Sequence, residues 1–259
     1  MTAKNTVWAD YTRAVSGQNR TIWMASGEVG TGKTRFGLQQ PAPVLVQSLD
    51  LGVEGVIDDI LEDMPAKDVY VKEYDWAPQA EEFNQEQAIV LRDQILADFA
   101  YGLKHARSIL WDKEGDIREV FEYADLGGPT DGSVKDWAKV NRRYFDLLNR
   151  VKSVPGVNMG FIQSMKDEWV STGVEVINPA TKKPRFNKVK SGRRLRAGYS
   201  RLDEVVMVEM HFVRQRGEFF FEVGKCRQNS RLNDQRIPAC DFADFGTLLR
   251  PGTEREDWQ

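Results

Sequence analysis

The stretch "WMASGEVGTGKTRFG", residues 23 to 37, passes from a short apolar run into three closely spaced glycines and then into Lys33 and Thr34. Residues 27 to 34 match the pattern G-x-x-x-x-G-K-[ST] at every fixed position, between an expected strand and an expected helix. Glycines let the backbone curl so that successive N–H groups face phosphate oxygens, and the start of the following helix adds its positive dipole end. The stretch therefore predicts a triphosphate-binding loop.

Strands and helices alternate around this loop. The apolar patterns predict strands at 21–26, 43–50, 68–74, 107–112 and 157–164, and helices at 33–40, 81–106 and 134–154. Such alternation predicts a three-layer α/β fold with a mainly parallel central sheet. Two runs at 203–213 and 218–227, joined by "RQRG", predict an antiparallel hairpin near the C-terminus. We expect one domain over 1–259, with its core at about 20–230 and a short tail at 238–259.

The composition is that of an ordinary globular protein, with 41% hydrophobic residues and a net charge of −3 over 259 residues. No apolar run reaches the roughly 18 residues of a membrane span, and the N-terminus lacks the apolar core of a signal peptide. These features predict a cytoplasmic protein without a membrane partner. Cys226 and Cys240 have no His or Cys nearby at metal-ligand spacing, so we expect two idle thiols.

The loop motif implies a set of roles for its residues, with ATP and Mg²⁺ as cofactors. Lys33 is expected to bridge the β- and γ-phosphates and Thr34 to place its hydroxyl on Mg²⁺. Asp112, which ends the strand "SILWD", is the expected second metal ligand. The acid that orients water is expected to be Asp50, with Glu54 and Glu114 as alternatives. The expected nucleotide contacts are Gly27, Glu28, Val29, Gly30, Thr31, Gly32, Lys33, Thr34 and Arg35.

Positive charge is concentrated late in the chain. Residues 182–201 hold nine Lys or Arg and no Asp or Glu, together with two aromatic residues, Phe186 and Tyr199. Cations neutralise phosphates, and exposed aromatics give unstacked bases a surface to lie on. Because residues 165–200 lack sustained periodicity, we expect a long flexible loop that binds single-stranded DNA, with a solvated basic loop as the alternative. The expected DNA contacts are Lys182, Lys183, Arg185, Phe186, Lys188, Lys190, Arg193, Arg194 and Arg196.

Over residues 20 to 230 the chain resembles the RecA-like ATPases. The resemblance is carried by the glycine loop, "VLVQSLDLG", "SILWD", "KVNRRYFDLLNRV", "MGFIQSMKDEW" and "VGKCR". It is closest to the compact phage-encoded versions associated with single-strand annealing and recombination. In that family the catalytic acid commonly belongs to a D-x-E pattern, whereas this chain has Ser48-Leu49-Asp50, so the acid is shorter and the first carboxylate is missing.

The resemblance implies further roles. Gln163 or Ser164 corresponds to the family's γ-phosphate sensor, which leads into its DNA-binding loop. Lys225 and Arg227 correspond to basic residues that reach a neighbouring subunit's γ-phosphate, which implies a homo-oligomer, either ring or filament. Host cytoplasm and a single-strand-binding protein as partner are further expectations of the phage subtype.

Other functions fit the same motif. They are a different P-loop motor, such as a helicase-loading or packaging ATPase, an ATP-dependent assembly switch with little turnover, and a P-loop kinase. The tryptophans are expected to pack in the core or at its rim, with Trp8 or Trp76 as candidates to flank the adenine base.

Overall fold

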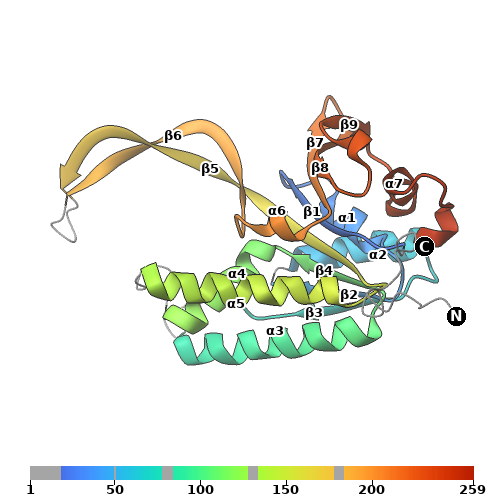
Figure 1. The fold of residues 1–259 in the computed structure, drawn as a ribbon, viewed down its shortest axis with the longest axis horizontal. Coiled ribbons are helices and arrows are strands. Elements are labelled where there is room, and N and C mark those ends of the chain that lie inside the picture. The colour runs from blue at the N-terminus through green and yellow to red at the C-terminus, as the bar shows by residue number, and fades with distance from the viewer. Residues whose placement is uncertain (1–18, 50, 78–83, 128–133, 178–183) are drawn as a thin grey trace, which may run out of the picture.

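The computed structural model describes residues 19–49, 51–77, 84–127, 134–177 and 184–259. A nine-stranded sheet lies between two helical layers (Figure 1), with the strand order β3-β2-β4-β5-β1-β7-β8-β9 and β6 paired with β5. The strands from β3 to β7 in this order run parallel, and β8 and β9 are antiparallel. The expected three-layer α/β fold with a mainly parallel central sheet and a C-terminal antiparallel hairpin is confirmed.

The strands are β1 (Ile22–Gly27), β2 (Val44–Ser48), β3 (Val69–Glu73), β4 (Ser108–Asp112), β5 (Asn158–Ile177), β6 (Pro184–Ala197), β7 (Val208–Gln215), β8 (Glu218–Cys226) and β9 (Gln235–Pro238). The helices are α1 (Lys33–Leu38), α2 (Glu54–Asp63), α3 (Gln85–His105), α4 (Glu114–Leu126), α5 (Val134–Ser153), α6 (Leu202–Val205) and α7 (Phe242–Leu249). No helix of the described residues is long and apolar enough to cross a membrane.

The central position of β1 brings the glycine loop to the middle of the sheet. β1 pairs with β5 on one side and β7 on the other, so that Ser26 stands opposite both Gln163 and His211. A strand buried on both faces favours a continuous apolar run, which "IWMAS" provides. The loop therefore emerges at the carboxyl edge of the parallel strands, where ligands bind in such sheets.

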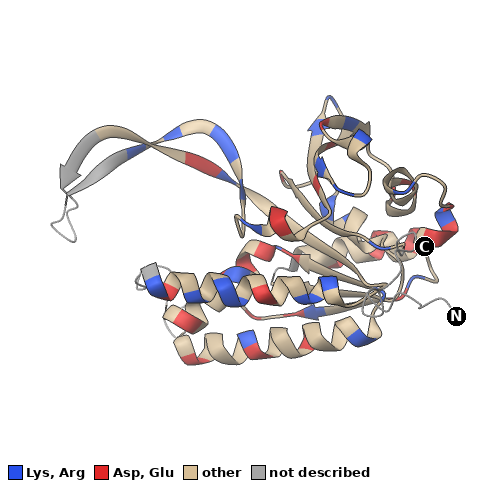
Figure 2. Cartoon of the chain, in the orientation of Figure 1, with Lys and Arg blue, Asp and Glu red and all other residues tan. Residues whose placement is uncertain are grey.

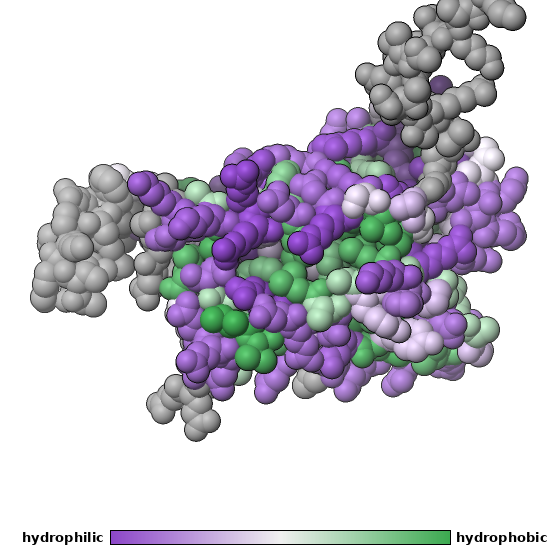
Figure 3. Space-filling model, turned by 60° about the horizontal axis from the view of Figure 1, so that its bottom comes forward, coloured by the Kyte–Doolittle hydropathy of each residue, from purple (hydrophilic) through white to green (hydrophobic). Residues whose placement is uncertain are grey.

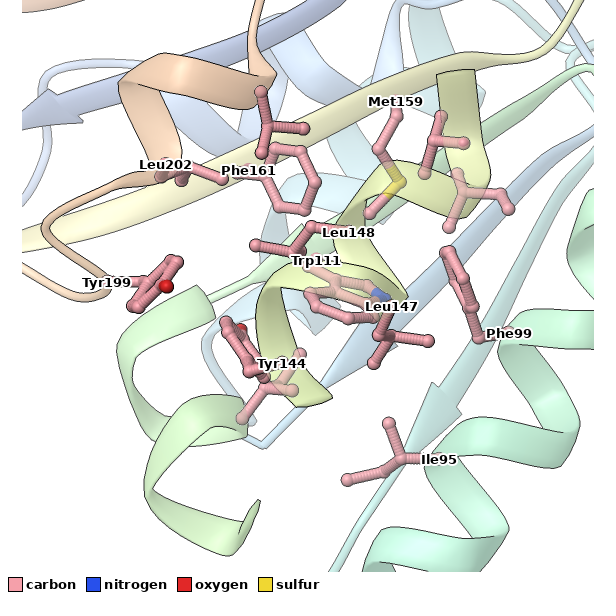
Figure 4. Close-up of a cluster of buried hydrophobic side chains, with 14 of the residues drawn as sticks. Ile95, Phe99, Trp111, Tyr144, Leu147, Leu148, Met159, Phe161, Tyr199 and Leu202 are labelled. Carbon is pink, nitrogen blue, oxygen red and sulfur yellow. The ribbon is translucent and has the colours of Figure 1, made fainter. Parts of the chain in front are cut away.

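Two apolar clusters cover the two faces of the sheet. Trp111 lies in the cluster under α3, α4 and α5, between the rings of Phe99 and Phe161 (Figure 4). Phe36 lies at the centre of the second cluster, which packs under α1 and α7. Seen from the side of α3 and α5, hydrophilic side chains surround patches of apolar ones (Figure 3). The central parallel strands are thus buried on both faces, whereas the edge strand β3 is partly exposed.

Helix α3 begins close to where the apolar spacing predicts. Asn84 and Gln87 form a capping box, in which each side chain accepts the other residue's backbone N–H. Leu91, Ile95 and Phe99 then follow at spacings of four and are all buried. These residues attach α3 to the sheet. Residues 81–83, also expected to be helical, lie outside the described residues.

The segment expected to be a loop at 165–200 is instead mostly a hairpin. β5 continues past the edge of the sheet and pairs with β6 as a two-stranded ribbon that projects from the body (Figure 1). We call residues 165–177 and 184–197 the arm. Both of its faces meet solvent, so no buried face imposes the alternating pattern that reveals a strand. Gly173 and Gly192 have φ values of +75° and +82° and lie at two register shifts of the ribbon.

The C-terminal hairpin is confirmed with one change. The residues expected to open its first strand form the short helix α6 instead, and β7 begins at Val208. Arg216 and Gly217 form the turn, and both have positive φ, at 55° and 87°. Two such residues give a turn whose twist matches that of the flanking strands.

Candidate nucleotide site and basic arm

The P-loop, residues 27–34, takes a backbone conformation that its glycines allow. Gly27, Gly30 and Gly32 have φ values of +148°, +74° and +89°. A Cβ on Gly27 would lie 2.5 Å from the carbonyl oxygen of Phe212 in β7, so only glycine fits there. Val29 at the tip is 99% exposed. The loop is therefore anchored at its start and open at its tip.

Lys33 lies across the loop. Its ammonium donates to the carbonyl oxygens of Gly27 at 2.9 Å and of Glu28 at 2.7 Å. Burial lowers the pKa of Lys33, and the negative charges of Asp112 and Glu28 partly oppose that shift. Its third donor makes a longer contact with the Thr31 hydroxyl at 3.4 Å, the weakest of the three and the one that an anion at the mouth of the loop would replace.

Thr34 and Asp112 meet although they are 78 positions apart in the sequence. The Thr34 hydroxyl donates to a carboxylate oxygen of Asp112 at 3.3 Å. Asp112 ends β4 and is 7% exposed. Hydroxyl and carboxylate oxygens are ligands that Mg²⁺ accepts when a nucleotide's phosphates supply others, so this donor set fits the metal predicted from the sequence.

Two other expected nucleotide contacts, Arg35 and Thr31, have side chains that bond within the protein. Arg35 forms ion pairs with Asp63 and, at 3.8 Å, with Asp59, both in α2. Thr31 donates its hydroxyl to the carbonyl of Glu28 at 2.8 Å, which tightens the turn. Thus the Arg35 side chain braces α1 against α2.

Glu114 is a buried carboxylate at the start of α4. It accepts hydrogen bonds from the Tyr144 hydroxyl at 2.7 Å, the Gln163 side-chain amide at 2.8 Å and the Tyr199 backbone N–H at 3.1 Å. Burial raises the pKa of Glu114, and the three hydrogen bonds and the charge of Arg118 oppose the rise. A carboxylate that is fully covered and holds three donors does not fit the water-activating role considered for it, so that alternative is wrong.

Of the other two acids considered for that role, the structure describes only Glu54. Asp50 lies outside the described residues. Glu54 is the first residue of α2 and is exposed. Within the described residues no group of three or more His, Cys, Asp or Glu side chains is arranged to hold a metal ion. Any metal here would therefore depend on the Thr34 and Asp112 pair together with phosphate oxygens.

Gln163 faces Glu114. Its carbonyl oxygen Oε1 is buried and has no hydrogen-bond partner among the described residues. Ser164, the other expected sensor, is exposed at the point where β5 enters the arm. Gly198, which follows β6, has a φ of +147°, and a Cβ there would lie 2.3 Å from both Gln163 Nε2 and Glu114 Oε2. The end of the arm is thus packed directly against this pair.

One face of the arm combines cations with an aromatic ring. Cross-strand pairing sets Arg194 opposite Asp167, Lys190 opposite Trp169, and Lys188 opposite Ser171, all on the same face. The Lys190 ammonium lies 2.6 Å from Asp167 and 5.7 Å from the centroid of Trp169, whose side chain is 55% exposed. Figure 2 shows blue segments along this ribbon. Trp169 lies outside the cation-rich run at 182–201, so the charge pattern of the sequence does not point to it, and only the strand pairing brings it beside Lys190.

Arg194 also contacts the P-loop. Its guanidinium lies 3.5 Å from a carboxylate oxygen of Glu28 and 3.5 Å from Asp167. Both side chains of the Arg194–Glu28 pair are about half exposed, so the pair contributes little stability by itself, about 0–1 kcal/mol. It nevertheless joins the root of the arm to the phosphate loop.

Several expected DNA contacts have other roles or lie outside the description. Arg196 is at the foot of the arm, where it bonds to Glu209 at 2.9 Å. Tyr199, expected to be an exposed aromatic, is 2% exposed and donates to the carbonyl of Asn141 at 3.2 Å, so that expectation is wrong. Lys188 and Arg193 form no ion pair with a described residue. Lys182 and Lys183 lie outside the described residues, as do the side chains of Arg185 and Phe186.

Lys225 and Arg227 lie at the edge of the sheet opposite the P-loop. β8 runs back along β7, so its last residue, Cys226, pairs with Val208. The Arg227 N–H donates to the carbonyl of Met207, and the Lys225 ammonium donates to that of Asp203 at 2.6 Å. Neither can serve the P-loop of its own chain.

Of the two tryptophans considered for the base, the structure describes only Trp76. Trp8 lies outside the described residues. Trp76 packs edge-on against Tyr123, with ring centroids 5.8 Å apart, on the α4 side of the molecule.

Comparisons with known proteins leave the function open. No family model and no curated protein matches the chain. A KaiC-like protein from Pyrococcus horikoshii has a TM-score of 0.42 and 12% identity, with 84% of each chain covered. The flagellar accessory protein FlaH from Methanocaldococcus jannaschii has a TM-score of 0.42 and 10% identity, covering 87% of this chain and 86% of that one. These similarities are too low to bear on activity.

Proposed function

We propose that this chain is a P-loop ATPase that binds Mg·ATP at residues 27–34 and acts on single-stranded DNA. The observation that carries the nucleotide part is the contact between the Thr34 hydroxyl and Asp112, at 3.3 Å. It joins the loop motif to the strand-end acid, which are the two parts that a magnesium–triphosphate site requires. When bound, Mg²⁺ would be held by these two residues and would neutralise charge on the phosphates.

The chain's own residues supply the remaining work. Loop N–H groups bind the phosphates, and Lys33 adds a positive charge. Hydrogen bonds from Lys33 to the carbonyls of Gly27 and Glu28 already hold this charge in place. Asp50 remains our first candidate for orienting the attacking water, with Glu54 behind it. Glu114 instead holds Gln163 in place through a 2.8 Å hydrogen bond.

The arm supports the DNA part of the proposal. Lys188, Lys190 and Arg194 share a face with Trp169, so phosphates meet cations while a base can stack on the ring. Such a surface binds backbone without reading sequence, because none of these contacts addresses a base edge.

Nucleotide and DNA would be coupled through the root of the arm. Gly198 packs on Gln163 and Glu114, and Arg194 lies beside Glu28 of the P-loop. A phosphate bound at the loop and DNA bound on the arm therefore act on neighbouring residues, and each can favour the arrangement that suits the other.

We further propose a homo-oligomer. Because Lys225 and Arg227 lie away from their own P-loop, a catalytic role for them requires the loop of a neighbouring copy. A head-to-tail interface of this kind forms rings or filaments. Recombination or replication of phage DNA in the host cytoplasm, with a single-strand-binding protein as partner, is the proposed use.

The test is the ATPase rate with and without single-stranded DNA. Strong stimulation is expected. Turnover that DNA leaves unchanged would instead favour a loader, a packaging motor or a kinase, and no turnover in either condition would favour an assembly switch. A library of small hydroxyl-bearing compounds distinguishes a kinase from the two motors, because a kinase transfers the phosphate to a hydroxyl and does not release it as inorganic phosphate.

A matched pair of variants isolates the arm. Lys188→Ala with Lys190→Ala removes two cations from its basic face, whereas Lys104→Ala with Lys139→Ala removes two exposed cations from α3 and α5. Only the first pair should weaken DNA binding. Equal affinities of the two double variants at low salt would refute the arm as the DNA surface.

A further inference from the structure

A second hollow adjoins the P-loop. It has a volume of about 370 Å³ and lies between α1 and the segment from β8 to the start of α7. Gly32 and Arg35 line it on the P-loop side, and Phe219, Phe221 and Cys240 line it on the other. Its size is within the range of small-ligand sites, roughly 300–1,000 Å³.

The floor of this hollow is aromatic and rigid. Phe212 and Phe221 are each 2% exposed, with ring centroids 4.5 Å apart, and Phe36 meets Phe221 at 5.2 Å. Phe219 stands at the rim, 39% exposed, with the Arg214 guanidinium 5.2 Å from its ring centroid. A flat apolar ligand would find a fixed surface here with little ordering required.

The wall opposite α1 is held in place by backbone contacts. The Ala239 N–H donates to the carbonyl of Phe219 at 2.9 Å, which fixes the segment carrying Cys240. Burial and two neighbouring carboxylates raise the pKa of the Cys240 thiol to about 12, so this group is neutral. The thiol therefore adds no charge to this wall, and the Asp241 carboxylate beside it is paired with Arg255 at 2.7 Å.

Most of its polar lining residues already have partners: Thr31 donates to Glu28, Arg35 pairs with Asp63, and Asp241 pairs with Arg255. Gln39, which lines the hollow from the end of α1, makes no side-chain hydrogen bond to a described residue. An amide offers both a donor and an acceptor, which is the pattern along the edge of a nucleobase. A mostly apolar hollow with one free amide suits a flat ring that carries polar groups on its rim.

The hollow and the P-loop are parts of one surface. Thr31 and Gly32 belong to both, and the start of the loop at Gly27 packs on Phe212, whose ring lines the hollow. A nucleoside triphosphate with its phosphates in the loop has its base a few bonds away, on the side where α1 begins. We infer that this hollow holds the base of the bound nucleotide, a purine, stacked on Phe219 with its edge toward Gln39. This inference rests on the proposed function and adds to it the part of the ligand that the loop does not touch.

Two ligands separate the base from the phosphates. Mg·ATP engages both surfaces, whereas Mg·tripolyphosphate engages the P-loop alone, and calorimetry measures both affinities. Phe219→Ala should weaken Mg·ATP about tenfold, since one stacked base contributes on that order, and leave tripolyphosphate unchanged. Phe220→Ala is the matched control, because Phe220 is the next residue of β8 and contacts Arg236 on the opposite face. Ala239→Leu, which fills the hollow instead of emptying it, should also weaken Mg·ATP selectively.

The outcomes distinguish this inference from the proposed function. Unchanged ATP affinity in both Phe219→Ala and Ala239→Leu would overturn the base site and leave the P-loop function standing. An equal loss for ATP and tripolyphosphate would also overturn it, because the effect would then lie in the loop. Wild-type protein that binds neither ligand would overturn the proposed function and the base site together.

Discussion

The junction between the arm and the nucleotide site depends on one glycine. Gly198 has a φ of +147°, and an added Cβ would lie 2.3 Å from both Gln163 Nε2 and Glu114 Oε2. Alanine at this position therefore has two costs. The backbone would hold a conformation that L-residues rarely adopt, and the 2.8 Å hydrogen bond between the two side chains would have to move.

These costs set the expected magnitude. A residue held in such a backbone region costs about 1–3 kcal/mol, and losing a hydrogen bond to a buried charged group costs about 1.5–3 kcal/mol. Gly198→Ala should therefore lower the free energy of unfolding by about 3–5 kcal/mol. That loss is large beside a typical stability of about 5–15 kcal/mol, yet it leaves the protein folded in the upper part of that range.

Gly192→Ala provides the control. Gly192 also has a positive φ, +82°, but no atom lies within 4 Å of an added Cβ. Only the backbone cost applies, about 1–2 kcal/mol. Urea unfolding followed by tryptophan fluorescence gives both values. Equal losses in the two variants would show that Gln163 and Glu114 make room freely, and the account of the junction would be refuted.

Three further predictions address the site itself. Lys33→Ala should abolish Mg·ATP binding in calorimetry, and retained affinity would disqualify the P-loop. Glu114→Gln should become more stable relative to wild type as pH rises from about 4.5. The reason is that the pKa of Glu114 is raised in the folded state, so the stability that Glu114 contributes is lost as pH passes through that raised pKa. A difference in unfolding free energy between the two proteins that stays constant from pH 5 to 8 in urea unfolding would contradict this. Lys188→Ala with Lys190→Ala should reduce the slope of log affinity for single-stranded DNA against log salt by about 1.4, and an unchanged slope would exclude phosphate contacts there.

The sequence was sufficient where a local pattern decides the structure. The glycines of the P-loop take the positive φ values that the motif requires, and β1 and β4 are apolar because the sheet buries both of their faces. The contact between Thr34 and Asp112 was also predictable, since the carboxyl ends of all parallel strands lie at one edge of the sheet, although β5 separates β4 from β1.

The environment of Glu114 could not be predicted. In the sequence it is an acid in the first turn of a helix, a position normally open to solvent. Its burial comes from Tyr144, Gln163 and Tyr199, which arrive from three separate segments. The same packing buries Tyr199, which the sequence placed among exposed aromatics.

The aromatic hollow beside the P-loop could not be predicted from the sequence for a related reason. In "EFFFE" the three phenylalanines indicate a buried strand and nothing more. Only the pairing of β8 with β7, and of β7 with β1, brings Phe219 and Phe221 beside the P-loop. The role of this strand depends on sheet order, which local periodicity does not contain.

The difference between a loop and an arm changes how DNA and nucleotide can communicate. A loop that orders on DNA would lose backbone entropy of about 1–2 kcal/mol per residue, whereas paired strands have already lost it. A two-stranded ribbon is only marginally stable alone, so its direction depends on where it is attached. That attachment consists of the bond from Arg196 to Glu209, the ion pair from Arg194 to Glu28, and Gly198 packed on Gln163. Since the last two contacts involve residues of the proposed nucleotide site, we expect a shift of those residues to move the arm with them.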